Sequence, residues 1–562
     1  MLVGSGRAAA QNVQHTKNAP GIGLRSVFKV NPATNALELE VPFGPTGYPQ
    51  RGGATVAPAI SYSSRIWRIA YLGPIYGTAT QQGPPPLIGT RVVPRLSEES
   101  RMGWTYSLEA PYPEWTAQDA MGGEVYDAWG NSESMCTVGS GSACCFIDRV
   151  RIHMPGGGTQ EFRSSDRPVC YDSSGNTPIL PDDLYSVDGS RMHLRRSENR
   201  LYLPDGSYWV LASGQTPAQL FDRNGNLLLN GFTDGLNRSF ANPLDTSLGT
   251  EYTYTVPGVG GTPVAYTLRW RYLDEVLTTP QPLPNFSDDC GNTTCAEPYL
   301  FKSDTGASEP VKTAGGSGKI NPLVLYQIVL PHDASDPNPP TYTFTYNVYA
   351  EIDKVVYPTG GYERFAYGLV EPQQSGTYVY AEGNRGVTDR WVSARGDGTD
   401  EAHWQYLWYD SEGQPHRGEI TPDGTKTERF QYYTSFGITY WSFTDARAGR
   451  PREERVYNAA GQLIRRKLSE WAATGSDNCP TGGGAYSSCT ATRNPRLTKT
   501  VEVIIEPGGQ ALAKTTTYGY DLTYQSTTGV NQTSVNEYDF VSVDQSTGRM
   551  ATSAPSSRRR SH

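Results

Sequence analysis

One short turn pattern recurs along this chain and constrains its fold more than any other feature. It consists of an aromatic residue, Asp or Asn, two variable residues, Gly and an amide residue, as in "YDAWGN" and "FDRNGN". Asp or Asn can hydrogen-bond its own backbone two residues on, and Gly accepts the positive φ that closes a tight hairpin. The pattern therefore predicts β-hairpins, each with an aromatic ring at a strand end that stacks on the neighbouring hairpin. Its members are Tyr126, Asp127 and Gly130; Tyr171, Asp172 and Gly175; Phe221, Asp222 and Gly225; Tyr409, Asp410 and Gly413; and Tyr457, Asn458 and Gly461.

The composition agrees with frequent chain reversals. The 562 residues include 60 Gly and 41 Pro, together with 36 Tyr and 11 Trp, and no long 3.6-residue amphipathic pattern occurs. Many Gly and Pro with abundant aromatic residues favour short strands joined by tight turns. We therefore predict an all-β fold in which repeated β-hairpins form a long spiralling antiparallel sheet. A chain of this length forms several domains or one extended repetitive body.

A second type of turn alternates with the first and helps to divide the chain. Examples are "MPGGGTQEF", "LPDGSYWVL" and "TPDGTKTERF", in which Pro or Asp precedes Gly and alternating polar and aromatic residues follow. Both turn types lie outside a region from about Pro280 to Lys319 that is rich in Gly, Pro, Ser and Thr, which we interpret as a large insertion or a seam between two β blocks. The predicted order is a flexible lead-in (1–24), an N-terminal β segment (25–120), a first hairpin block (121–280), a loop or insertion (281–320), a second hairpin block (321–545) and a flexible C-terminal tail (546–562).

Charge and hydropathy exclude two classes of partner. The formal net charge is −9, and the only dense basic run is Arg558-Arg559-Arg560, so the chain lacks the basic surface of a nucleic-acid binder. No apolar run approaches the roughly 18 to 20 residues that cross a bilayer, so we predict no transmembrane segment. The N-terminus lacks the apolar core of a signal peptide, but "RAAAQ" resembles the end of a cleaved leader, so we expect a leader lying upstream and a secreted or cell-surface location.

The cysteines support the same compartment. Two local pairs lie in turn-rich loops, and an even number of cysteines in such loops favours disulfides in an oxidising environment. Free thiols and a metal site remain the alternatives, the latter weakened by the spacing and by the scarcity of His. The candidate disulfide residues are Cys290 with Cys295, Cys479 with Cys489, and the group Cys136, Cys144, Cys145 and Cys170.

Several motifs suggest chemistry that their context does not support. "GGSGK" at Gly315–Lys319 lacks the first Gly and the Ser or Thr of a phosphate loop, and "DRNGN" at Asp222 lacks the later Glu of a calcium loop. The Arg395-Gly396-Asp397 tripeptide would suit a receptor-binding tip, although such tripeptides recur by chance. Neither HExxH nor GxSxG occurs. We therefore predict no enzyme activity, no cofactor and no metal, with paired carboxylates for glycoside hydrolysis as the open enzymatic alternative.

These turns resemble those of the YD-repeat proteins, also called Rhs proteins. "YDSEGQPHRGEITPDGTKTERFQY" resembles one full repeat, "FDRNGNLLLNGFTDGLNRSF" a second, and "YNAAGQLIRRKLSEW" the first half of a third. The resemblance implies a secreted or cell-surface protein whose repeats form a hollow shell around a C-terminal toxin, or in other members an adhesion module. The chain departs from this pattern because it shows neither the self-cleaving segment nor the variable C-terminal enzyme, so we expect a segment that acts with a downstream continuation or another chain.

We accordingly predict a non-enzymatic structural shell segment that encloses or presents a polypeptide cargo. The alternative is a carbohydrate-binding or adhesion module that contacts a surface glycan. Alternation along "WQYLWYD" would place three rings on one face of a strand, where they could stack on sugars, namely Trp404, Tyr406 and Trp408.

Overall fold

The computed structural model has the all-β fold that the turns predict, which confirms the fold class. Among the described residues, the helical elements are four 3₁₀ turns: η1 Arg51–Gly53, η2 Thr246–Leu248, η3 Val259–Gly261 and η4 Leu273–Glu275. The structure describes residues 28–32, 35–44, 47–66, 69–76, 87–94, 101–119, 145–155, 159–163, 169–170, 182–186, 192–281, 312–313, 320–369, 385–411, 414–432, 450–472, 496–520, 532–542 and 557–560.

The N-terminal β segment forms a small sheet of its own. This antiparallel sheet has the order β1-β2-β5-β8, with β1 Phe28–Val30, β2 Leu37–Pro42, β5 Ala59–Ser63 and β8 Trp104–Tyr106. The sequence "LELEVP" of β2 alternates Leu and Val with charged residues, and the apolar set is the buried one. Two short hairpins accompany the sheet: β3 Tyr48–Pro49 with β4 Thr55–Val56, and β6 Ile69–Tyr76 with β7 Leu87–Pro94.

An 11-stranded antiparallel sheet follows, in which strands from β13 to β19 are neighbours in chain order. Its first strand, β9, begins at Tyr112, inside the predicted N-terminal segment. It belongs to this sheet because it pairs along its full length with β10. The strands are β9 Tyr112–Asp119, β10 Cys145–His153, β11 Thr159–Arg163, β12 Val169–Cys170, β13 Asp183–Ser186, β14 His193–Arg195, β15 Arg200–Tyr202, β16 Tyr208–Val210, β17 Gln219–Phe221, β18 Leu227–Asn230 and β19 Thr233–Asp234.

A 17-stranded antiparallel sheet forms the rest of the chain, and it begins within the predicted first block rather than after it. Its order runs from β20 to β38 in chain order, interrupted only by the separate β22–β23 hairpin. The first strands are β20 Glu251–Pro257, β21 Pro263–Tyr272, β22 Lys312–Thr313, β23 Ile320–Asn321, β24 Leu323–Val329, β25 Thr341–Tyr346, β26 Ile352–Val356, β27 Tyr362–Leu369 and β28 Arg385–Ser393. The others are β29 Ala402–Ser411, β30 Gln414–Ile420, β31 Lys426–Gln431, β32 Pro451–Tyr457, β33 Leu463–Ala472, β34 Arg496–Ile505, β35 Ala511–Tyr520, β36 Gln532–Tyr538, β37 Val541–Ser542 and β38 Ser557–Arg560.

The last strand corrects one expectation. Ser557–Arg560 lies in the predicted flexible tail, yet it pairs with β36 as β38. Arg558 is opposite Glu537 in this pairing. The basic run is therefore part of the sheet rather than a solvated tail.

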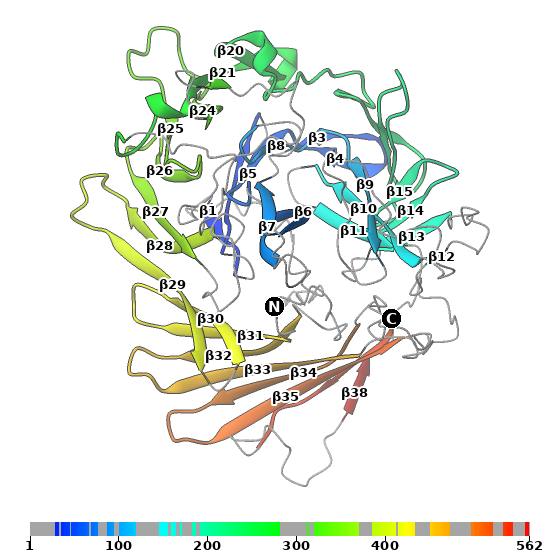
Figure 1. Ribbon diagram of the computed structural model, residues 1–562, viewed down its shortest axis with the longest axis vertical. Coiled ribbons are helices and arrows are strands. Elements are labelled where there is room, and N and C mark those ends of the chain that lie inside the picture. The colour runs from blue at the N-terminus through cyan, green and yellow to red at the C-terminus, as the bar shows by residue number, and fades with distance from the viewer. Residues whose placement is uncertain are drawn as a thin grey trace, which may run out of the picture.

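The two large sheets curve around the N-terminal sheet (Figure 1). One apolar cluster joins all three, from Phe28 and Trp104 through Leu201 to Tyr406, and a second, smaller one lies on β34 and β35. Buried hydroxyl groups connect the sheets across long sequence distances: Ile352 N–H donates to Tyr62 Oη at 3.0 Å, and the hydroxyls of Tyr106 and Tyr254 lie 2.8 Å apart. We call the side of each large sheet that carries this cluster the core face.

Candidate functional surfaces of the wall

Four of the turns that the sequence assigned to two types share one structure, namely those at Leu203, Asp222, Thr421 and Asn458. In nine hairpins of the described part of the chain, the N–H of the first loop residue donates to the carbonyl of the fifth, and the N–H of the fourth donates to the carbonyl of the first. The fourth residue has positive φ, as in a three-residue loop with a bulge. The first residues are Leu203, Asp222, Asp234, Gly258, Asn347, Tyr357, Thr421, Asn458 and Glu506, and the fourth are Gly206, Gly225, Asn237, Gly261, Ala350, Gly360, Gly424, Gly461 and Gly509.

Asp222 shows why an acidic or amide residue opens several of these loops. Its Oδ1 accepts the N–H groups of Asn224 and Asn226, both at 2.8 Å, and its Oδ2 accepts Asn226 Nδ2 at 2.8 Å. Asn458 repeats the arrangement by accepting the N–H groups of Ala460 at 3.1 Å and Gln462 at 2.9 Å. Turn donors thus occupy both oxygens of Asp222, the residue that resembled a calcium ligand.

The other predicted turns differ. At Tyr409 the strands continue further, because Asp410 pairs with Pro415 and Ser411 with Gln414, which leaves a two-residue loop in place of the three-residue one. Gly413 of this loop lies outside the described residues, as do the turns that begin at Tyr126 and Tyr171.

The leading aromatic rings have different neighbours. Phe221 stacks on Tyr208 at 5.1 Å between ring centroids, and Tyr409 stacks on His416 at 5.2 Å. Tyr457 instead faces Lys426, whose Nζ lies 4.5 Å from the ring centroid. Stacking on an aromatic neighbour is therefore not general.

A row of neighbouring aromatic rings crosses five strands on the side opposite the core face. Tyr185, His193, Tyr202, Tyr208 and Phe221 belong to β13 to β17, and consecutive centroids lie 4.6, 5.4, 5.6 and 5.1 Å apart. The first, second and fourth of these contacts are stacked, so those ring faces cover one another and leave their edges outward, whereas the Tyr202 and Tyr208 rings are tilted by 41°. Such edges are unsuited to stacking on a flat ligand.

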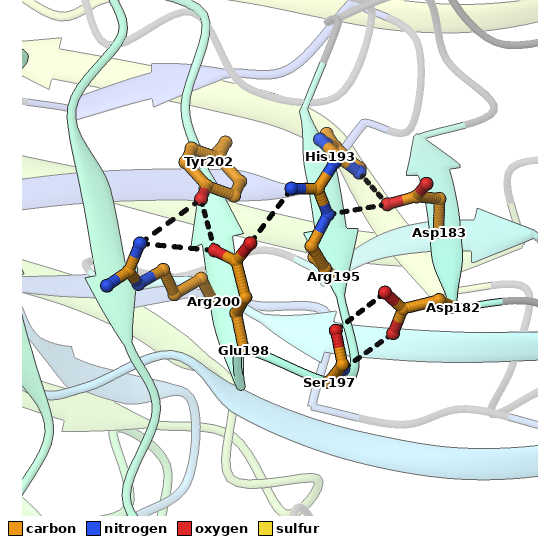
Figure 2. Close-up of polar contacts among 8 residues, drawn as sticks. All are labelled: Asp182, Asp183, His193, Arg195, Ser197, Glu198, Arg200 and Tyr202. Atoms are coloured by element: carbon orange, nitrogen blue, oxygen red, sulfur yellow. Dashed lines mark hydrogen bonds and ion pairs between the residues drawn. The ribbon is translucent and has the colours of Figure 1, made fainter.

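Charged side chains lie beside His193 and Tyr202 of this row (Figure 2). Asp183 Oδ1 lies 2.7 Å from His193 Nε2 and accepts Arg195 Nε at 3.0 Å. Burial alone would raise the pKa of the Asp183 carboxyl, but the hydrogen bonds from His193 and Arg195 hold it below its usual value. These charges compensate one another and connect β13 to β14.

Glu198 extends the same network to β15 (Figure 2). It accepts Tyr202 Oη at 2.6 Å, Arg195 Nη1 at 2.9 Å and Arg200 Nη1 at 3.1 Å. The hydrogen bonds from Tyr202 and then Arg195 lower the pKa of the Glu198 carboxyl. Beside it, Asp182 accepts both the N–H and the hydroxyl of Ser197 at 2.6 Å.

The proposed sugar-stacking row lies on the core face of β29. Tyr406 belongs to the apolar cluster with 8% of its surface exposed, and Trp404 packs against that cluster. Guanidinium groups lie above both indoles: Arg390 is 4.9 Å from the Trp404 ring and Arg417 is 5.7 Å from the Trp408 ring. The row therefore forms the border of the packed interior.

Beyond Trp408 the same face becomes charged. The residues that pair one after another across β30 to β35 are Arg417, Arg429, Glu454, Lys467, Glu502 and Lys514. Directly paired residues share a face, so these six continue the line of Trp408. Arg429 is 2.9 Å from Glu419 and 3.4 Å from Glu454, so part of the row consists of ion pairs. The hydropathy of single strands did not predict this change.

Two ion pairs are buried on the aromatic part of the wall. Arg385 Nη2 lies 2.7 Å from Glu351, and Arg390 Nε lies 2.7 Å from Glu363; both carboxylate side chains are 1% exposed. Buried pairs of this kind need additional hydrogen bonds, and Tyr357 Oη supplies one to Glu363 at 2.5 Å. These ion pairs could not be predicted from the spacing of charged residues in the sequence, because each pair joins two different strands.

Two of the candidate disulfide residues are brought together. Cys145 of β10 and Cys170 of β12 are directly paired. The other six, Cys136, Cys144, Cys290, Cys295, Cys479 and Cys489, lie outside the described residues.

Metal-ligand clusters and long apolar helices would be further signs of function in the described part of the chain. There, no group of three or more His, Cys, Asp or Glu is arranged to hold a metal ion. Nor does any helix in these residues combine the length and the apolar character needed to span a bilayer.

No protein-family model matches this sequence, and no curated protein matches it either. Among solved structures, the crystal structure of TcdB2-TccC3 is similar over 91% of this chain and 30% of that chain, at 10% identity and a TM-score of 0.23. The crystal structure of TcdB2-TccC3-Cdc42 is similar over 89% of this chain and 23% of that chain, at 10% identity and a TM-score of 0.19. The structure of the Photorhabdus luminescens Tc holotoxin pore is similar over 90% of this chain and 25% of that chain, at 11% identity and a TM-score of 0.17. The chain spans less than a third of each of these structures' matched chains.

Proposed function

We propose that this chain is a non-enzymatic structural segment, the wall of a YD-repeat shell from a secreted or cell-surface protein, and that it encloses or presents a polypeptide cargo. The observation that carries the proposal is the order of the 17-stranded sheet, in which each hairpin pairs with the one before it in the chain. A wall built this way covers each strand edge with the next hairpin. It can therefore extend without exposing edges along its surface.

The charged row on the core face of β30 to β35 supports a confining role. Its ion pairs, such as Arg465 with Glu454 at 3.0 Å, satisfy one another within the wall. A polypeptide held against this surface gains little apolar contact, so it remains detached from the wall. Confinement then acts by excluding proteases and bulk solvent, and it requires no chemistry from the wall.

The experiment is protease protection of a passenger. A disordered passenger of about 60 residues with several protease sites is fused after His562 of the full chain. We expect cleavage at least tenfold slower than for the free passenger, and loss of protection in urea that unfolds the wall. Cleavage of the fused passenger at the free rate, while the wall itself resists the protease, would refute confinement.

The alternative function is carbohydrate binding through Trp404, Tyr406 and Trp408. The burial of Tyr406 and the guanidinium groups above both indoles favour a packing role for this row. Trp404→Ala should therefore lower stability and leave glycan-array signals unchanged. An array hit that Trp404→Ala abolishes in a folded protein would establish the alternative.

A further inference from the structure

The tip of the β28–β29 hairpin carries two exposed and opposite charges around one glycine. Arg395 and Asp397 are exposed, and Gly396 between them has a φ of +78°. Within the described residues, the Arg395 guanidinium has no hydrogen-bond or ion-pair partner. The Asp397 carboxylate is bound only at Oδ1, which accepts the N–H and the hydroxyl of Thr399 at 2.9 and 2.8 Å. A cationic group and one carboxylate oxygen are thus both available to a partner.

This tip is held in one conformation by groups below it. Ser393, 1% exposed, donates its hydroxyl to Asp400 Oδ1 at 2.7 Å and accepts the N–H of Gly396 at 3.1 Å. Gly396 also lies against the adjacent hairpin tip, where a Cβ would stand 2.2 Å from Gly360 O. A loop fixed in this way loses little entropy when a partner binds.

A second tip in the same sheet shows that the turn itself does not need the arginine. The segment Thr421–Thr425 also contains Asp-Gly-Thr, and Asp423 Oδ1 accepts the N–H of Thr425 at 3.0 Å, as Asp397 does with Thr399. At the position two residues before Asp423 stands Thr421 rather than Arg. The folding of the loop therefore explains Asp397 and Gly398, and it uses the N–H of Arg395, which donates to Asp400 Oδ2 at 3.2 Å, but not the Arg395 guanidinium.

We propose that Arg395-Gly396-Asp397 is a docking tip for a cell-surface receptor that binds the Asp carboxylate through a divalent cation and the Arg guanidinium through its own carboxylates. Hard divalent cations prefer carboxylate oxygens, and guanidinium groups form bidentate pairs with carboxylates. The two exposed charges supply both halves of such a contact. The site is independent of the wall's confining role, since it lies at a loop tip.

The test measures binding of the full chain to an RGD-binding integrin ectodomain in Mn²⁺. Asp397→Glu keeps the charge but moves the carboxylate by one methylene, and we expect it to weaken binding at least tenfold. Asp423→Glu, the same change in the matched tip, should leave binding unchanged, and chelation of the cation should abolish it. Thermal melting of both variants checks that the fold is intact.

Three results would overturn the proposal. They are an absence of binding by the unaltered chain, equal binding by Asp397→Glu and the unaltered chain, and binding that survives chelation. The last result would indicate simple charge attraction, which high salt would remove. Protease protection of a passenger is unaffected by any of these results, so the docking tip and the confining wall stand or fall separately.

Discussion

Replacing Asp234 with Asn should destabilise the seam between the N-terminal segment and the 11-stranded sheet. The Asp234 side chain is fully buried and accepts four hydrogen bonds. Its Oδ1 accepts the N–H groups of Leu236 and Arg238, both at 2.9 Å, and its Oδ2 accepts Gln50 Nε2 at 2.9 Å and Arg238 Nε at 2.7 Å. Gln50 belongs to the N-terminal segment, so this carboxylate joins that segment to the turn after β19.

The size of the effect follows from these contacts. An Asn amide nitrogen at either oxygen position faces two donors, so either rotamer loses two hydrogen bonds. Hydrogen bonds to a charged group contribute about 1.5–3 kcal/mol each, which gives a loss of about 3–6 kcal/mol. Gln50→Ala removes only one of the four bonds and should cost about 2 kcal/mol. Comparing the two variants therefore separates the contribution of the Asp234 carboxylate to stability from that of its single bond with Gln50.

The assay is urea denaturation followed by tryptophan fluorescence, with acid titration as a second readout. Burial alone would raise the pKa of the Asp234 carboxyl, but hydrogen bonds from the Arg238 N–H, Gln50 and the Arg238 side chain hold it below the usual value. Its contribution is therefore present above the unfolded pKa near 4 and is lost as the pH falls through the folded value. A change below about 1 kcal/mol for Asp234→Asn would refute this account of the seam.

Three further predictions concern the wall. Directly opposed antiparallel Cα atoms lie about 4.5–5.5 Å apart, which is within disulfide range, so nonreducing peptide mapping of the oxidised protein should show a Cys145–Cys170 bond. This bond closes a loop of roughly 25 residues and should stabilise the fold by about 3.5 kcal/mol, and two free thiols would contradict the prediction. Glu363→Gln leaves Arg390 buried and unpaired, so it should cost about 3–5 kcal/mol in chemical denaturation, and a cost below about 1 kcal/mol would argue against the buried pair. Burial raises the pKa of Tyr252 to about 12, so its contribution to stability is complete below pH 10 and is lost as the pH rises toward 12. In a pH titration, tyrosinate absorbance and unfolding should therefore appear together, and ionisation of Tyr252 near pH 10 in the folded protein would contradict the prediction.

Turn chemistry was the part of the fold that the sequence predicted best. The loops after Phe221 and Tyr457 have the local bonds that Asp or Asn followed by Gly favours. The hairpin at Asn347–Glu351 was missed because Ala350, at a φ of +58°, stands where Gly is expected. Its signal was Asn347, which accepts the N–H groups of Tyr349 and Glu351 as Asp222 does in its own loop.

Contacts between distant segments could not be predicted from the sequence. Gln50 meets Asp234 across 184 positions, and Tyr62 meets Ile352 across 290, and neither contact belongs to a local pattern. The change of the core face from aromatic to charged was hidden for a similar reason. It follows from the register of pairing between strands, and a one-residue shift would place Trp408 opposite a different residue.

Hydrogen–deuterium exchange with peptide-level mass spectrometry tests the central claim most directly, namely that the strands from β24 to β35 form one continuous wall. Exchange in a single cooperative sheet is limited by the same opening event. The wall predicts that peptides from β24 to β29 and from β30 to β35 are protected together and lose protection at the same urea concentration. Full exchange of β30 to β35 within seconds, while β24 to β29 stay protected, would contradict it.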